Sequence, residues 1–158
     1  MTKYEFRERP DKELRVKSAI VLAGIVLQDA PDVLVPHRRE LLDKMIWKIT
    51  EAESMNKLRT RYCSLEAYSL PDEKLHHEHV FEKEKLITEL LRCGPSLVER
   101  VLSVAVACVV TETEHDRLYG LPERLHGWDR YVEAKIPVVD VMETQIQKKL
   151  VMFLDPRS

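Results

Sequence analysis

The stretch Val104-Ala-Val-Ala-Cys-Val-Val110 decides the fold class of this chain. It is apolar throughout and rich in β-branched residues, which favour extended structure. It also directly continues a segment in which Ser96 and Glu99 have the spacing of a helix-capping box. Periodicity does not separate a buried strand from the end of a buried helix in so short a run. A helix here predicts a mainly α protein, and a strand predicts an α+β protein with a small sheet.

A second short apolar segment, Ile136-Pro-Val-Val139, could pair with this run if both are extended. The residues between them contain a capping box formed by Thr111 and Glu114, and a short helical segment that begins at Trp128. Parallel neighbouring strands need a crossover connection of this kind. We therefore expect the helices between residues 111 and 135 to cover one face of any such sheet.

Helical patterns dominate the first third of the chain. Asp11 can open a helix that runs to about Asp29, and its apolar residues wrap most of the way round, as in a central core helix. Pro36 is suited to the first turn of a second helix, which we expect to run to about Leu58. Residues 1–10 are charged and end in a proline, so we expect a flexible arm.

The rest of the chain contains weaker and shorter patterns. Residues 59–68 alternate weakly, as in a short strand or hairpin. Residues 86–91 form one helical stripe, and residues 139–153 predict a final helix. Together these patterns predict a compact single domain over residues 1–158, mainly α with six or seven helices, or α+β with a small sheet.

Composition, charge and absent motifs argue against several classes of protein. The net charge is −2, which gives no overall electrostatic case for nucleic acid. Cys63, Cys93 and Cys108 form no CxxC motif, which argues against disulfides and thiolate zinc sites and favours a cytoplasmic location. The most apolar run, Ala19 to Leu27, is far shorter than the about 20 residues that span a bilayer, so we expect no membrane partner. Phosphate-binding loops, dinucleotide fingerprints and the GxSxG elbow are absent from the sequence.

The segment His76-His77-Glu78-His79 is the first candidate site. In a strand, His77 and His79 point to one side and His76 and Glu78 to the other, whereas in a helix His76 and His79 lie one turn apart. Histidine is both a metal ligand and an acid–base group near neutral pH. One hypothesis is a catalytic set of His77, His79 and His115. Another is a divalent metal on His77 and His79, completed by His115 or Asp116. The alternative is that these histidines cap the following helix and bond the backbone.

The second candidate site consists of three residues, which precede the histidine segment in the sequence. Arg59 and Arg61 fall on one side of an extended segment and could hold a phosphate, while Tyr62 could stack on a base. Combined with nearby histidines, they would suit cleavage of a phosphodiester, which needs a base, an acid and a cation. The alternative is that both arginines pair with nearby acids such as Glu66.

A third candidate, formed by Trp128, Arg130 and Tyr131, has the residue types of protein-binding hot spots. The alternative is that the two aromatic residues anchor the core. From these features we expect a small interaction protein that binds another protein, of the inhibitor, immunity or regulatory type found among bacterial and phage accessory proteins. A nuclease-like histidine or metal enzyme on phosphodiesters is the alternative. A non-catalytic nucleic-acid binder that uses the basic residues 38–61 is the third hypothesis.

Overall fold

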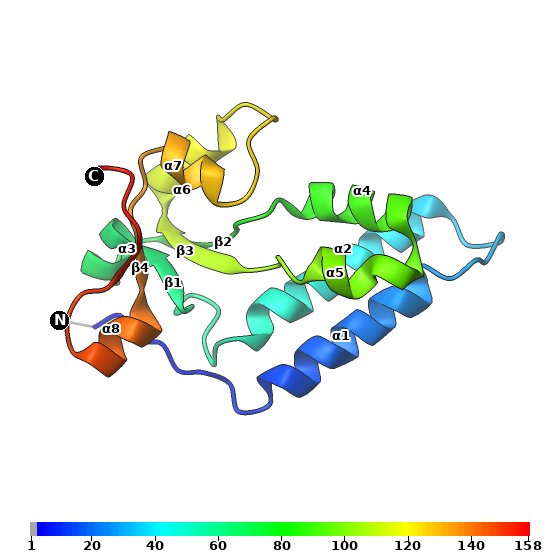
Figure 1. The fold of residues 1–158 in the computed structure, drawn as a ribbon, viewed down its shortest axis with the longest axis horizontal. Helices are drawn as coiled ribbons and strands as arrows, with labels where there is room; N and C mark the ends of the chain where they lie inside the picture. The colour runs from blue at the N-terminus through cyan, green and yellow to red at the C-terminus, as the bar shows by residue number, and fades with distance from the viewer. Residues whose placement is uncertain (1–2) are drawn as a thin grey trace.

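The computed structural model describes residues 3–158 and shows an α+β fold (Figure 1). Within these residues, eight α-helices and one 3-10 helix surround a five-stranded mixed sheet. The helices are α1 (Lys12–Val26), α2 (Val35–Ala52), α3 (Leu65–Ser69), α4 (Lys83–Cys93), η1 (Pro95–Leu97), α5 (Val98–Leu102), α6 (Glu112–Tyr119), α7 (Trp128–Glu133) and α8 (Val141–Gln147). The strands are β1 (Tyr62–Ser64), β2 (Leu75–His79), β3 (Ala107–Thr111), β4 (Val138–Asp140) and β5 (Met152–Leu154).

The apolar run Val104–Val110 ends in a strand, because β3 begins at Ala107, and every residue of β3 is buried. The α+β alternative is therefore confirmed, although the sheet is larger than expected. The strand order is β2-β3-β1-β4-β5, with β1 and β3 parallel and the other neighbours antiparallel. The expected pairing of residues 104–110 with 136–139 is wrong, since β1 lies between β3 and β4 and pairs with both.

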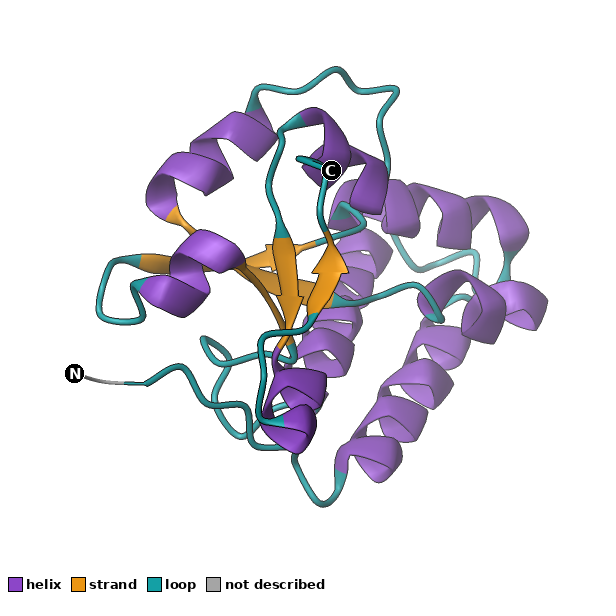
Figure 2. Cartoon of the chain, turned by 60° about the vertical axis from the view of Figure 1, so that its left-hand side comes forward, coloured by secondary structure: helices purple, strands orange, loops and turns teal. Residues whose placement is uncertain are grey.

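Helices form two groups around this sheet. The helices α1, α2, α4 and α5 pack together on one side of the molecule, and α3, α6, α7 and α8 surround the sheet on the other (Figures 1 and 2). Successive side chains of the central strands point to opposite faces of the sheet, and a separate core cluster lies on each face. Val109 faces the cluster that contains Tyr4 and Phe6, whereas Cys108 and Val110 face the cluster that contains Tyr131.

Several element boundaries differ from expectation. The helix α2 ends at Ala52 rather than near Leu58, and the final helix α8 ends at Gln147, where Lys148 takes a left-handed conformation with φ 54°. The described part of the expected flexible arm is packed instead. Tyr4 and Phe6 are buried, and the Phe6 backbone exchanges two hydrogen bonds with the side-chain amide of Gln145.

Three strands end in a polar residue that caps the helix following it. The side chains of Ser64, Thr111 and Asp140 accept from backbone N–H groups at the start of α3, α6 and α8. The capping box predicted for Thr111 and Glu114 is confirmed. Among residues 3–158, no helix is both long enough and apolar enough to cross a lipid bilayer.

Candidate functional site

The strand β2 divides its histidines between two faces. Extended backbone points alternate side chains in opposite directions, as the sequence predicts for a strand. His77 and His79 face α2, where both rings contact Trp47. The other face meets α6, where the ring of His76 stacks on that of His115. His115 is therefore separated from His77 and His79 by the strand.

This division prevents the metal site expected from His77, His79 and His115. Within residues 3–158, no group of three or more histidine, cysteine or acidic side chains has an arrangement that could hold a metal ion. Asp116 lies exposed on α6, one position beyond His115. The same division separates the predicted catalytic set of His77, His79 and His115, since His115 lies on the opposite face of β2 from the other two.

On the α2 face, the two histidines form a neutral network through Thr50. The Thr50 hydroxyl lies 3.0 Å from His79 Nε2 and 3.3 Å from His77 Nε2. His77 Nδ1 donates to the Lys57 carbonyl at 2.7 Å, so its Nε2 is left to accept from Thr50. The Thr50 hydroxyl accepts from His79 Nε2, and its own proton lies between His77 Nε2 and the Trp47 carbonyl, each 3.3 Å away. Burial lowers the pKa of His77, and burial together with His77 and Lys83 lowers the pKa of His79 to about 3. These two rings are suited to a structural role.

On the α6 face, a buried arginine holds a carboxylate against a partly exposed histidine. His115 Nδ1 lies 2.7 Å from Glu78 Oε2, and Glu78 Oε1 lies 3.3 Å from Nη2 of Arg130. Arg130 is only 4% exposed and also donates to the carbonyls of His79 and Val80. Its Nε lies 3.2 Å from Glu82. Arg130 thus orients Glu78, and Glu78 in turn orients His115.

This arrangement determines which nitrogen of His115 is available. The Glu78 carboxylate accepts only, so it favours the tautomer with the proton on Nδ1 and leaves the Nε2 lone pair free. The His115 side chain keeps 34% of its area exposed. His76 stacks on it with ring centroids 4.5 Å apart and 3° between planes. His76 Nε2 is buried, has no hydrogen-bond partner among the described residues and lies 3.9 Å from Glu112 Oε1. Two stacked imidazoles, whose side chains are 27% and 34% exposed, therefore lie in one partly buried site.

The residues predicted to bind phosphate do not converge on one point. Arg61 donates through Nε and Nη2 to Asp140, and this contact raises the pKa of Arg61. Arg59 donates to the carbonyls of Leu58 and Pro71. Tyr62 packs its ring against Trp128 and Phe153. Both guanidinium groups are therefore already hydrogen-bonded within the protein. The acid that pairs with Arg61 is Asp140 rather than the predicted Glu66.

The residues predicted to bind a partner protein contribute to the interior. Tyr131 is fully buried in the sheet core, and Arg130 is buried against β2. Trp128 is half-buried and contacts Tyr131 and Phe153. This burial agrees with the alternative interpretation as core anchors. Sequence reasoning missed the role of Arg130 in orienting Glu78, because nothing local marks two residues 52 positions apart as partners.

No protein-family model, curated protein or solved structure matches this chain. The functional argument therefore depends on the geometry where β2 meets α6.

Proposed function

We propose that this protein is a histidine-based acid–base enzyme that acts on phosphodiesters, with His115 as the general base. One observation carries the proposal: His115 Nδ1 lies 2.7 Å from Glu78, and buried Arg130 holds that carboxylate in place. A carboxylate behind an imidazole fixes its tautomer and stabilises the imidazolium that forms when Nε2 takes a proton. The buried Arg130 in turn fixes the orientation of the Glu78 carboxylate.

His76 supplies the second proton-transfer group. In the proposed reaction, His115 Nε2 removes a proton from the attacking hydroxyl or water while its oxygen bonds to phosphorus. The bond from phosphorus to the leaving oxygen then breaks, and protonated His76 gives its proton to that oxygen. Lys74, which pairs with Glu112 beside His76, is the candidate cation for the phosphate.

The test is cleavage of labelled RNA and DNA, with and without a metal chelator. The substitution His115→Ala should reduce the cleavage rate by about 100- to 10,000-fold. His77→Ala is the matched control, because His77 lies on the opposite face of the same strand. Activity that survives His115→Ala, or that disappears equally in both variants, argues against the proposal. Activity that requires a divalent metal points to a different mechanism at this surface.

A second function, binding of a partner protein in an inhibitory, immunity or regulatory role, is supported by a different surface from the one predicted. The helix α1 exposes large apolar side chains along its outer face, including Leu14 at 72% and Ile25 at 54% exposure. Contiguous exposed apolar surface of this kind marks interaction sites. Retention of a specific protein by the wild type, but not by a variant with a charge on this helix, would support this second function.

A further inference from the structure

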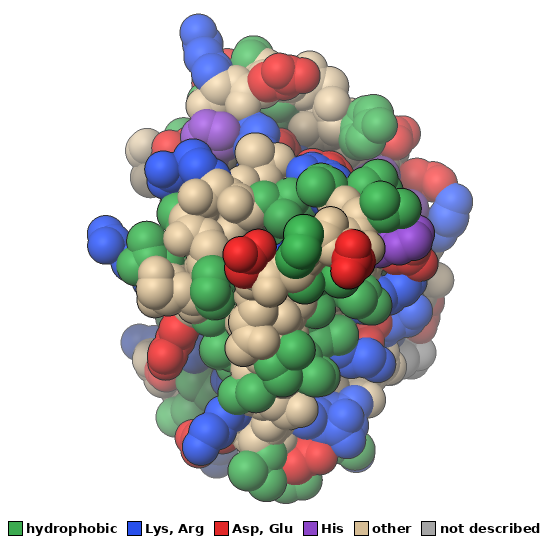
Figure 3. Space-filling view, turned by 90° about the vertical axis from the view of Figure 1, so that its right-hand side faces the viewer, with side chains coloured by type: hydrophobic (Ala, Val, Ile, Leu, Met, Phe, Trp, Pro, Cys, Tyr) green, Lys and Arg blue, Asp and Glu red, His purple; other side chains and the backbone are tan. Residues whose placement is uncertain are grey.

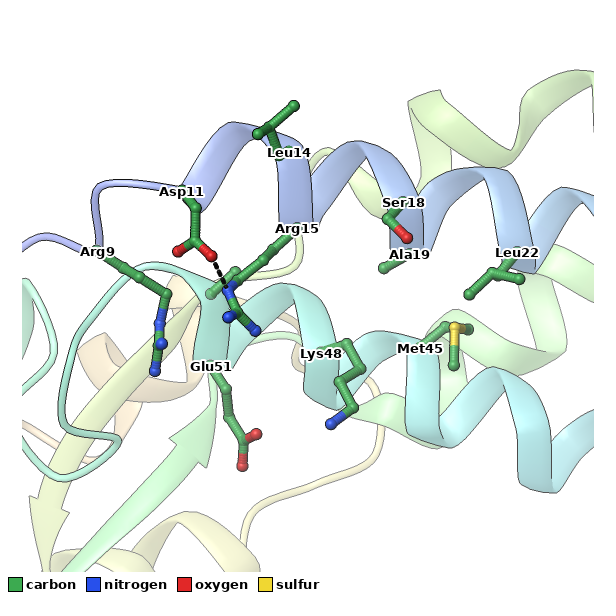
Figure 4. A pocket seen from close by; sticks show the side chains of 11 residues that line it. Arg9, Asp11, Leu14, Arg15, Ser18, Ala19, Leu22, Met45, Lys48 and Glu51 are labelled. Atoms are coloured by element: carbon green, nitrogen blue, oxygen red, sulfur yellow. Dashed lines mark hydrogen bonds and ion pairs between the residues drawn. The ribbon is translucent and has the colours of Figure 1, made fainter.

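A groove of about 480 Å³ lies between α1 and α2 (Figure 4). Its volume is within the range of about 300–1,000 Å³ that is typical of sites for small molecules. Ala19 and Ala52 are buried and form part of its lining, so small side chains leave this space open. The sequence prediction of a central core helix is correct for the face of α1 that packs on α2. It is wrong for the side with Leu14 and Leu22, which are 72% and 46% exposed.

The groove has a charged end and an apolar end. Figure 4 shows the apolar side chains of Leu22 and Met45 farther along the two helices than the charged side chains of Arg9, Arg15, Lys48 and Glu51. Arg15 and Leu22 are seven positions apart in α1, which places the two ends about 10 Å apart along the helix axis. Beyond the apolar end, hydrophobic side chains form a band over the end of the molecule at the α1–α2 connection (Figure 3).

The charged end has an excess of one positive charge. Its cations are Arg9, Arg15 and Lys48, and its acids are Asp11 and Glu51. Arg15 Nε donates to Asp11 at 2.7 Å, so these two residues largely neutralise each other. Lys48 and Glu51 form no ion pair within residues 3–158. A ligand with one negative charge would balance this end of the groove.

Arg9 lacks a partner more clearly than any other arginine in the described part of the chain. It is partly buried, its Nε is buried without a hydrogen-bond partner among the described residues, and its Nη atoms form no hydrogen bond there. Those Nη atoms are not buried, so a ligand in the groove can reach them. Arg100 and Arg124 also lack side-chain partners within residues 3–158, but both are exposed. A partly buried guanidinium without partners is suited to bind an anion, since its N–H donors are otherwise unsatisfied.

We infer that this groove binds a small amphipathic anion, a carboxylate on an unbranched alkyl chain of about eight to ten carbons. The planar guanidinium of Arg9 matches the geometry of a carboxylate. An extended chain of this size spans about 10 Å, which brings its far end to Leu22 and Met45. Glu51 disfavours a second negative charge, such as that of a phosphate monoester. The inference goes beyond the proposed function and is independent of the site where β2 meets α6.

The experiment is a titration of the isotope-labelled full chain with decanoate, followed by the NMR chemical shifts of the backbone amides. We expect shifts at residues that line the groove, with a dissociation constant of about 0.1–1 mM for a ligand of this size. Acetate has the carboxylate without the chain, and decyltrimethylammonium has the chain with the opposite charge. Each should bind at least about 10-fold more weakly than decanoate if both ends of the groove contribute.

Substitutions test the two ends separately. Arg9→Gln should weaken decanoate binding about 10-fold, because it removes a charge-assisted hydrogen bond. Arg124→Gln is the matched control, since Arg124 also lacks a partner among the described residues but lies outside the groove. Leu22→Glu should weaken binding by at least about 10-fold by placing a carboxylate beside the alkyl chain. Ile146→Glu, at an exposed position on α8, is its control.

The amide spectrum of each variant also verifies that the fold is kept. Absence of shifts in the groove at about 10 mM decanoate overturns the inference, since a complex with a dissociation constant of about 1 mM would then be almost fully formed. Binding that Arg9→Gln leaves unchanged overturns it as well. Equal affinity for decyltrimethylammonium would show that the groove is an apolar surface without selectivity for an anion, which also contradicts the inference.

Discussion

His76 and His77 are neighbours in the sequence, yet their rings lie on opposite faces of β2 and belong to different networks. The His76 ring stacks on His115, its side chain is 27% exposed, and its Nε2 is buried without a hydrogen-bond partner among the described residues. The His77 ring packs on Trp47 and bonds to Thr50, where burial lowers its pKa and favours the neutral form. The strand thus separates a candidate chemical site from a structural network, and the two make different predictions.

Removal of Arg130 should be severely destabilising. Arg130→Leu leaves the Glu78 carboxylate, which is only 13% exposed, without its buried counter-ion and deprives two backbone carbonyls of a donor. We expect the free energy of unfolding to fall by about 3–5 kcal/mol in urea denaturation. The control Arg117→Leu should cost less than about 1 kcal/mol, because Arg117 is half exposed. Equal losses in the two variants would contradict the role given to Arg130. Adding Glu78→Gln to Arg130→Leu should recover part of the loss, since it removes the stranded charge.

Acid should destabilise the protein through His79. Its pKa is lowered from 6.5 to about 3 in the folded state, so below pH 6.5 the unfolded chain binds the extra proton. The stabilising contribution is complete above pH 6.5 and is lost as pH falls toward about 3. From this group alone we expect the free energy of unfolding to decrease by about 2 kcal/mol between pH 7.5 and pH 5.

The substitution His79→Phe tests this dependence, because it removes the titrating group and keeps an aromatic ring beside Trp47. Denaturant unfolding at a series of pH values should show a shallower loss for the variant than for the wild type. His37→Gln serves as the control, because His37 is exposed on α2 and should leave the slope unchanged. An unchanged slope in His79→Phe would assign the acid sensitivity to other groups.

Ser64 should contribute more to stability than a helix cap alone. Its hydroxyl accepts from the Ala67 N–H at 3.0 Å and donates to the buried carboxylate of Glu114, whose pKa is raised by burial. Ser64→Ala should cost about 2–3 kcal/mol of unfolding free energy. Loss of the donor raises the pKa of Glu114 further, so the cost should be larger at pH 8 than at pH 5. Ser69→Ala, at an exposed position at the end of α3, should cost less than about 1 kcal/mol. A cost independent of pH would indicate that only the cap was lost.

Local patterns in the sequence predicted those features that depend on neighbouring residues. Of the strand and helix alternatives for the histidine segment, the strand correctly divides His76 and Glu78 from His77 and His79, and the spacing of Thr111 and Glu114 correctly predicts a capping box. Each depends only on backbone geometry within a few positions. The same is true of the helix that begins near Pro36.

Features that depend on distant residues were missed or misplaced. Arg61 meets Asp140 across 79 positions, so a pair of arginines that resembles a phosphate site is instead partly neutralised by an acid. Arg130 was predicted at the surface because nothing nearby in the chain identifies Glu78 as its partner. The apolar residues on all sides of α1 predict that both of its faces are buried, but the sequence does not show whether residues of the same chain bury them. Only the three-dimensional arrangement distinguishes these cases.

Gly127 should be required for the contact between the segment before α7 and the segment that follows β2. Its φ of 58° is strained for any other residue, and an added Cβ would overlap the ring of Phe81. Gly94 provides a matched control, because its φ is 75° but no atom lies within 4 Å of an added Cβ. Gly94→Ala should therefore show backbone strain alone, about 1 kcal/mol, while Gly127→Ala should cost more than about 3 kcal/mol. The excess is the overlap with Phe81. It should decrease when Gly127→Ala is combined with Phe81→Ala, so that the double variant is more stable than the sum of the two single losses. Additive losses in urea denaturation would mean that the Phe81 ring moves aside at no cost and that strain at Gly127 accounts for the whole effect.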